Sequence, residues 1–131
     1  MKRIMISLGV FLTLVLVLSI SSCRLENTNT FNLNADEIKE IVGTSQMSDP
    51  VITKTFTDDE TIGEITNVVN SLNLTNTNNV GELKGWQYYF VVRYSNGEEI
   101  TLAFSENNIL IDGVVFNTSK YNPSSFDSCF Y

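Results

Sequence analysis

The sequence predicts an α+β domain in which one helix packs on a four- to five-stranded antiparallel meander sheet. Three observations support this fold class. An amphipathic helical pattern stands near the middle of the chain, and two hairpin turn signals follow it. The chain has 131 residues, and its apolar leader leaves about 100 for a folded domain. That length is enough for one modest hydrophobic core and too short for two.

The leader is the first element. Residues 4–20 carry no charge and follow Lys2 and Arg3, and small residues come after them. This order of basic residues, apolar run and small residues is typical of a secretory signal peptide. The run is shorter than the roughly 20 apolar residues that a membrane-spanning helix needs. The sequence therefore predicts a signal peptide over residues 1–22.

The end of the leader reads Ile20-Ser21-Ser22-Cys23 and resembles the lipobox of bacterial lipoproteins. This resemblance implies cleavage before Cys23, a diacylglyceryl thioether on Cys23 and a location on the extracytoplasmic face of the cell membrane. Two acyl chains anchor a protein stably, whereas one chain exchanges. An ordinary signal peptide cut near Ser21 or Ser22 and an uncleaved anchor are the alternatives.

The residues after the leader divide into a tether and a domain. Residues 23–33 are polar with little periodicity, which predicts a lipidated N-terminus and a flexible tether. Residues 34–131 are expected to form a single α+β domain. If Cys23 carries lipid, Cys129 is the second of two cysteines and has no partner for a disulfide. We expect Cys129 to be a small buried residue.

The first part of the domain is predicted to contain a helix, a strand and a second helix. Asn34 precedes an apolar pattern that predicts a helix over 35–42, which Gly43 ends. Residues 51–56 alternate as a β-branched strand. Thr57 and Glu60 are spaced as a capping box for a helix over 58–72. The apolar stripe of that helix consists of Ile62, Ile65, Val68, Val69 and Leu72. The Asn/Thr-rich segment 74–79 is predicted to be a loop.

Two hairpins form the predicted meander. A three-residue turn with Gly97 in a left-handed conformation pairs Val92 with Ile100, which gathers the apolar residues of both strands on one face. The same register pairs Phe90 with Leu102 and Tyr88 with Phe104. Asp112-Gly113 predicts a two-residue turn that pairs Ile111 with Val114. We expect the 58–72 helix to cover the face that contains Tyr88, Phe90, Val92, Ile100 and Leu102.

Charge and composition exclude several classes of function. All 15 acidic residues and six of the eight basic residues follow residue 22, so the mature part carries a net charge of −9. Nucleic-acid binding needs clustered Lys and Arg, so we expect no nucleic-acid partner. The chain has no histidine, which excludes Ser-His-Asp, Cys-His and His-zinc sites. We therefore expect no enzyme activity, no catalytic residue and no cofactor.

The densest acidic group consists of Asp58, Asp59, Glu60 and Glu64. Carboxylates are ligands for Ca²⁺ or Mg²⁺. Three of these residues lie in the first turn of a predicted helix, where negative charge is favoured by the helix dipole. We therefore interpret the group as a helix N-terminus and expect no metal site.

A binding surface is predicted on the other face of the sheet. Tyr89 alternates with the apolar residues of its strand and so shares a face with Gln87, Val91 and Arg93. An accessible tyrosine offers a large contact area with little loss of entropy. Tyr89, Arg93 and Gln87 are therefore the candidate binding residues. The alternative is that the C-terminal aromatic residues Tyr121, Phe126, Phe130 and Tyr131 cover this face.

The mature pattern also resembles small lipoproteins of Gram-positive bacteria. The resemblance rests on a capped helix, a Gly-Trp-Gln-Tyr-Tyr strand, an Asn-Gly hairpin and an Ile-Asp-Gly-Val-Val-Phe hairpin. We expect a membrane-anchored, non-catalytic binding or accessory module that meets a protein or an envelope component. The alternative is a protective, immunity-type lipoprotein that inhibits a toxin or hydrolase, since an acidic surface suits a cationic target.

Overall fold

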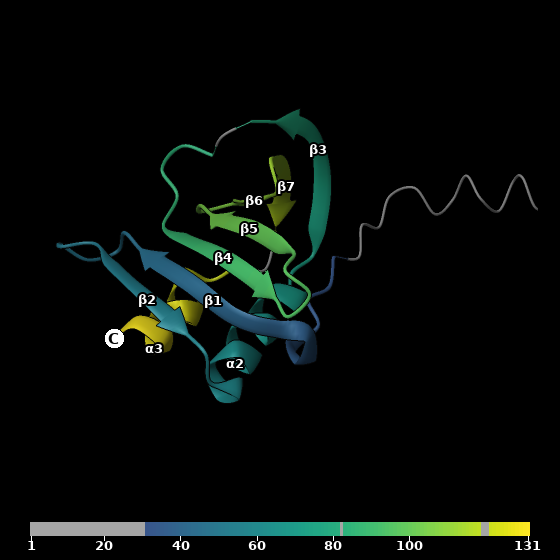
Figure 1. Ribbon diagram of the computed structural model, residues 1–131. Helices are drawn as coiled ribbons and strands as arrows, with labels where there is room; N and C mark the ends of the chain where they lie inside the picture. Colours follow the sequence, from purple (N-terminus) through teal and green to yellow (C-terminus); the bar gives the residue numbers. More distant parts are fainter. Residues whose placement is uncertain (1–30, 82, 119–120) are drawn as a thin grey trace, which may run out of the picture.

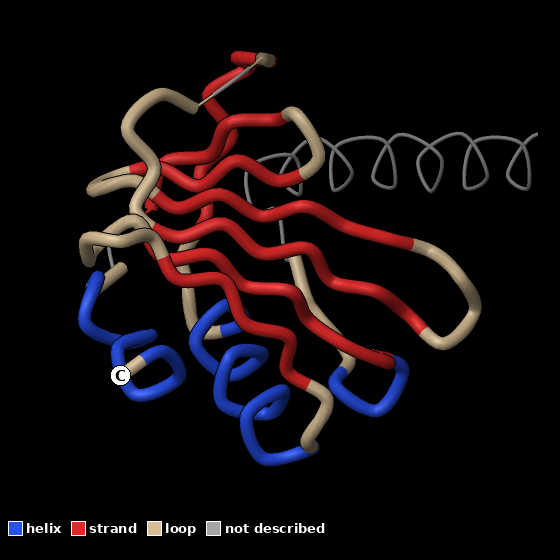
Figure 2. Tube along the Cα trace, turned by 60° about the vertical axis from the view of Figure 1, so that its left-hand side comes forward, coloured by secondary structure: helices blue, strands red, loops and turns tan. Residues whose placement is uncertain are grey.

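The computed structural model describes residues 31–81, 83–118 and 121–131. The predicted signal peptide, the lipobox with Cys23 and most of the predicted tether lie outside these residues. The described chain forms a single antiparallel sheet with helices on one side of it (Figures 1 and 2). Among the described residues, no helix combines the length and the apolar character needed to cross a membrane.

The sheet has seven strands in the order β2-β1-β4-β5-β6-β7-β3. The strands are β1 (Ile38–Ser45), β2 (Ile52–Phe56), β3 (Leu74–Val80), β4 (Tyr88–Tyr94), β5 (Glu99–Phe104), β6 (Asn108–Ile111) and β7 (Val114–Thr118). The helical elements are η1 (Ala35–Glu37), α2 (Asp59–Asn70), η2 (Pro123–Phe126) and α3 (Asp127–Phe130). The α+β class is confirmed. The sheet has more strands than the four to five expected, because β1 and β3 lie in segments that were predicted to be a helix and a loop.

The predicted helix over 35–42 is wrong. Asn34 does cap a helical turn, since its side chain accepts from the amide of Asp36, but that turn ends at Glu37. From Ile38 the chain forms β1, which pairs with β2 and β4. A register shift between Ile38 and Glu40 places Ile38 and Ile41 in the core, although they are three residues apart. The β-bulge therefore produced the spacing that resembled a helical period.

The predicted loop over 74–79 is also wrong. This segment is β3, an edge strand that pairs with β7. Its ladder is interrupted between Asn76 and Asn79, and Asn78 has a positive φ of 59°. The side chain of Thr77 donates to the carbonyl of Val115 at 2.7 Å and holds the irregular part against β7. A polar, irregular edge protects a sheet from pairing with other chains, so polar composition is compatible with a strand here.

The meander β4-β5-β6-β7 and both hairpin registers are confirmed. Val92 pairs with Ile100 and Arg93 with Glu99. The amide of Tyr94 donates to the carbonyl of Glu98 at 2.9 Å, and Gly97 has a φ of 91°, as the left-handed position of a three-residue turn requires. Ile111 pairs with Val114, and the intervening Asp112 and Gly113 both have positive φ.

The predicted strand over 51–56 and the helix over 58–72 are present with small changes at their ends. The stripe of α2 faces the core, where Ile62, Ile65 and Val69 are buried. The cap is Asp58 rather than Thr57, because the Asp58 carboxylate accepts from the amide of Thr61 at 2.8 Å. Hydrogen bonds from Thr61 lower the pKa of Asp58.

The covered face of the sheet carries the aromatic core. Tyr88, Phe90 and Phe104 are fully buried there. The C-terminal segment packs on them: the ring centroids of Phe90 and Phe126 are 4.9 Å apart, and those of Tyr88 and Phe130 are 5.5 Å apart. The C-terminal segment thus lies on the same side as α2, as Figure 2 shows. The alternative that it covers the Tyr89 face is wrong.

The folded domain begins before residue 34, the first residue of the predicted domain. The amide of Leu33 donates to the Asn70 side chain at 2.7 Å, and that side chain donates back to the Leu33 carbonyl at 2.8 Å. Leu33 is also buried in the core. The last residues of the predicted tether therefore pack against the C-terminal end of α2.

Candidate functional site

The face of the sheet opposite α2, here called the open face, carries the candidate binding residue Tyr89. Tyr89 lies at its centre, with Thr44 beside it on β1 and Ala103 beside it on β5. The same row continues through Leu110 to Val115. α2, η2 and α3 lie on the other side of the sheet (Figure 2). The prediction that Tyr89 points away from the core agrees with this arrangement.

Trp86 joins Tyr89 to form an aromatic pair. Their ring centroids are 5.5 Å apart, the rings are inclined by 47°, and both side chains are half-buried. Strand alternation extended back from Tyr88 would place Trp86 in the core, but the structure places its ring against that of Tyr89. β4 begins only at Tyr88, so the alternation does not extend back to Trp86. Gly85, with a φ of 71°, marks the turn that could have signalled this change of direction.

Hydroxyl groups border the aromatic pair on the β1 side. Thr44 pairs with Tyr89 across the ladder, and the hydroxyls of Thr44 and Thr53 lie 3.1 Å apart. Thr44 is half-buried and Thr53 is exposed. The row next to Tyr89 therefore offers hydroxyl donors and acceptors beside an aromatic surface.

Arg93 lies on the open face but is held by two carboxylates. Its guanidinium donates to Glu40 on β1 at 2.9 Å and to Glu99 on β5 at 3.1 Å. These hydrogen bonds raise the pKa of Arg93, and the cation stays charged. Arg93 is thus placed on the predicted surface, at one end of it, within an ion cluster of one guanidinium and two carboxylates.

Gln87 is not brought to the aromatic pair. It precedes β4, and its side-chain oxygen accepts a hydrogen bond from the hydroxyl of Tyr121 at 3.2 Å. Tyr121 packs on Phe104, which belongs to the covered face. Gln87 therefore links the strand to the C-terminal segment. Trp86 lies next to Tyr89, in the position that the sequence had suggested for Gln87.

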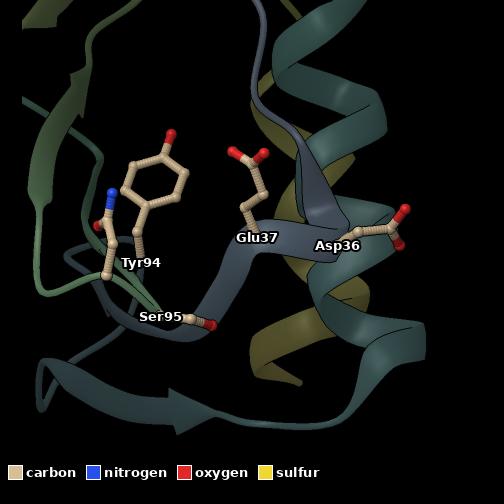
Figure 3. Close-up of a pocket in the computed structure, with 5 residues that line it drawn as sticks. Asp36, Glu37, Tyr94 and Ser95 are labelled. Carbon is tan, nitrogen blue, oxygen red and sulfur yellow. The ribbon is translucent and has the colours of Figure 1, made fainter.

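A pocket of about 370 Å³ was not anticipated from the sequence. It lies between η1 and the β4-β5 turn and is lined by Asp36, Glu37, Tyr94, Ser95 and Asn96. In Figure 3 the side chains of Glu37 and Tyr94 point the same way, whereas Asp36 is turned toward α2. Burial raises the pKa of the Tyr94 hydroxyl, and the charge of Glu37 adds to the effect. A second pocket of about 290 Å³ shares Asp36 and includes Asp59.

The other candidate groups are the acidic residues at the start of α2 and the thiol of Cys129. Asp58 caps α2, as described above. Within residues 31–81, 83–118 and 121–131, no group of three or more Cys, Asp or Glu side chains is placed to hold a metal ion. Cys129 is half-buried, with its sulfur 4.0 Å from a carboxylate oxygen of Glu64. Burial and this carboxylate raise the pKa of the Cys129 thiol, so the reactive thiolate is disfavoured.

Comparison with known proteins gives no relative from which a role could be transferred. No family model matches the chain, and neither the curated proteins nor the solved structures contain a match. The geometry of the open face is therefore the basis for the functional proposal.

Proposed function

We propose that this chain is a lipid-anchored, non-catalytic binding module on the extracytoplasmic face of the cell membrane, and that it binds through the open face. The observation that carries the proposal is the Trp86–Tyr89 pair. Both side chains are half-buried on the face opposite the one that α2 and the C-terminal segment cover.

The two faces of the sheet differ in a way that favours binding. The covered face is filled with large buried side chains, whereas the open face carries half-buried Val42, Tyr89, Val91, Leu110 and Val115. An antiparallel sheet that is solvated on one side normally presents polar residues there. Apolar and aromatic side chains gathered on such a face are typical of an interaction surface.

The proposed anchor limits where the ligand can be. Cys23 lies ten residues before Leu33, which Asn70 holds against the domain. Ten extended residues span at most about 35 Å. The domain would then reach only ligands close to the membrane surface, which suits a component of the inner cell envelope or another membrane-bound protein.

The chemistry of the chain supports binding without catalysis. The sequence lacks histidine, the usual general base at neutral pH. In the acidic group at the start of α2, Asp58 caps the helix, and Asp59 and Glu60 lie in the first turn, where negative charge is favoured. The thiol of Cys129 has a raised pKa and lies beside a carboxylate. These surroundings favour a binding role, with no cofactor required.

Site-specific photocrosslinking on intact cells tests this proposal. A photoreactive phenylalanine analogue is placed at position 89 or, as the matched control, at the exposed position 67 on α2. We expect a discrete adduct from position 89 and none from position 67. Equal labelling from both positions, or none from position 89, would refute binding through the open face.

A second candidate function is the inhibition of a basic toxin or hydrolase, and an acidic end of the domain favours it. Asp36 lines both pockets, with Glu37 and Tyr94 in one and Asp59 in the other. Such a site would attract a cationic partner through long-range electrostatics, which salt screens. Salt-sensitive capture that is lost in Asp36→Asn and retained in Tyr89→Leu would favour the inhibitor.

A further inference from the structure

We propose that the Trp86–Tyr89 pair is a binding site for a neutral glycan chain. This inference rests on the proposed function and names the ligand class of its open face. The site consists of the two aromatic rings, the Thr44 and Thr53 hydroxyls beside them, and the small Ala103 on the other side of Tyr89.

The rings provide the apolar half of the recognition. Sugar rings present C–H groups on their faces, and aromatic side chains are large, rigid surfaces for such groups. The inclination of 47° between Trp86 and Tyr89 forms a shallow wedge. A pyranose can lie against one ring while the next residue of the chain contacts the other. Ala103, which pairs with Tyr89 on β5, is buried at 2% exposure, so the rings and not this residue offer the contact surface.

The neighbouring hydroxyls provide the polar half. The Thr44 and Thr53 hydroxyls are 3.1 Å apart, and either can donate or accept. Adjacent hydroxyls or acetamido groups of a sugar need such flexible partners. Farther along the same face, Asn108 at the start of β6 pairs with Asn117 on β7, and these two residues extend the polar border.

Charge selects a neutral ligand over the alternatives. The row that contains Tyr89 consists of uncharged residues from β2 to β7. The charged residues of the open face at β1, β4 and β5 are Glu40, Arg93 and Glu99, in which one guanidinium pairs with two carboxylates. The mature chain carries −9 overall, so anionic polymers are repelled. A basic peptide is better matched by the acidic end with Asp36 and Glu37.

Trp86 makes the proposal directly measurable, because it is the only tryptophan of the chain. The processed chain, purified from expressing cells, is titrated with the tetramer of N-acetylglucosamine and with cellotetraose while tryptophan emission is followed. A glycerol phosphate oligomer and tetralysine serve as anionic and cationic probes. We expect a saturable change in emission with at least one neutral glycan and none with the charged probes.

Two variants distinguish the loss of sugar stacking on the Tyr89 ring from a loss of folding. Tyr89→Leu keeps apolar volume and removes one ring, so it should weaken glycan binding by about tenfold or more. Tyr131→Leu is the control, since the exposed Tyr131 lies outside the open face and its hydroxyl contacts Ser45, which pairs with the core residue Tyr88. This control should bind as the natural chain does. Circular dichroism confirms that both variants are folded.

The outcomes distinguish this inference from the proposed function. If neither neutral glycan changes the emission, or if Tyr89→Leu binds as well as Tyr131→Leu does, the glycan site is wrong. A protein adduct from position 89 together with such a result would leave the binding module standing and identify its partner as a protein. Equal binding of the charged probes would also overturn the inference.

Discussion

The packing around Gly43 leaves no room for a larger side chain. Gly43 lies in β1, between its partners Lys54 on β2 and Phe90 on β4. A Cβ atom at this position would lie 2.9 Å from the rings of both Phe90 and Phe130, and 3.0 Å from that of Phe56. The sequence had suggested that this glycine ends a helix. Its role in the structure is to let three aromatic rings approach the backbone of a central strand.

Gly43→Ala should therefore destabilise the domain. Overfilling a packed core typically costs about 1–3 kcal/mol of unfolding free energy. Gly63→Ala is the control, because nothing lies within 4 Å of its added Cβ on α2. Alanine there should stabilise the helix by up to about 1 kcal/mol. Urea unfolding measures both values, and equal stabilities would contradict the packing around Gly43.

Buried tyrosines should make the fold sensitive to alkali. Burial and the hydrogen bond to Asp127 raise the pKa of Tyr88, and burial raises the pKa of Tyr121. A raised pKa means that the folded state prefers the neutral phenol. Its contribution to stability is complete below the ordinary tyrosine pKa of about 10 and is lost as the pH rises above it.

Thermal unfolding between pH 8 and pH 11.5 checks this expectation. The midpoint should fall progressively above about pH 10. Tyr88→Phe should be less stable at pH 8, because it lacks the hydrogen bond to Asp127, but should lose less on going to pH 11.5. A variant that declines as steeply as the natural chain would show that Tyr88 does not titrate on unfolding.

At the scale of the elements, local turn chemistry was predicted well, whereas the strands β1 and β3 were missed. Both hairpin registers followed from turn residues and alternation, and the stripe of α2 followed from its period. β1 was missed because its bulge at Lys39 imitates helical spacing. β3 was missed because its pairing with β7 joins segments about 40 residues apart, which no local pattern encodes.

The C-terminal segment acts as a structural element of the core. The Phe130 ring packs edge-on against Phe56, with centroids 5.7 Å apart, and also contacts the Tyr88 and Phe90 rings. Its carbonyl accepts from the ammonium group of Lys54 at 2.8 Å. The sequence pattern does not predict this packing, because the last ten residues are mostly polar and contain too few aromatic residues to show a helix or strand period.

Phe130→Ala should cost about 3–5 kcal/mol of unfolding free energy, as expected for deleting a buried ring. Tyr131→Phe is the comparison, because Tyr131 is 59% exposed and loses only its hydrogen bond to Ser45. That loss should be about 1 kcal/mol. Equal effects of the two substitutions in chemical denaturation would mean that the C-terminal segment contributes little to the core.

At the scale of the whole molecule, the candidate site was partly predictable. Tyr89 and Arg93 lie on the predicted face because strand alternation fixes the direction of their side chains. Gln87 and Trp86 lie before the strand, where alternation does not apply, and the structure exchanges their expected places. The pocket beside Tyr94 depends on how η1 meets the β4-β5 turn, which the sequence pattern does not reveal.

The proposed anchor makes a prediction for the intact chain. If Cys23 is lipidated, Cys23→Ala should accumulate in the membrane as an unprocessed precursor, because cleavage follows lipid attachment. Cys129→Ala is the control and should be processed normally. The masses of the two proteins decide the outcome. A trimmed, released Cys23→Ala protein would indicate an ordinary signal peptide.

Oxidative footprinting of the chain on intact cells, compared with the purified chain, tests the central proposal most directly. Trp86 and Tyr89 report on the open face, while the exposed Met47 and Tyr131 report on surfaces outside it. A binding module that uses the open face should show several-fold less oxidation of Trp86 and Tyr89 on cells, with Met47 and Tyr131 unchanged. Equal oxidation of Trp86 and Tyr89 in both samples would contradict it.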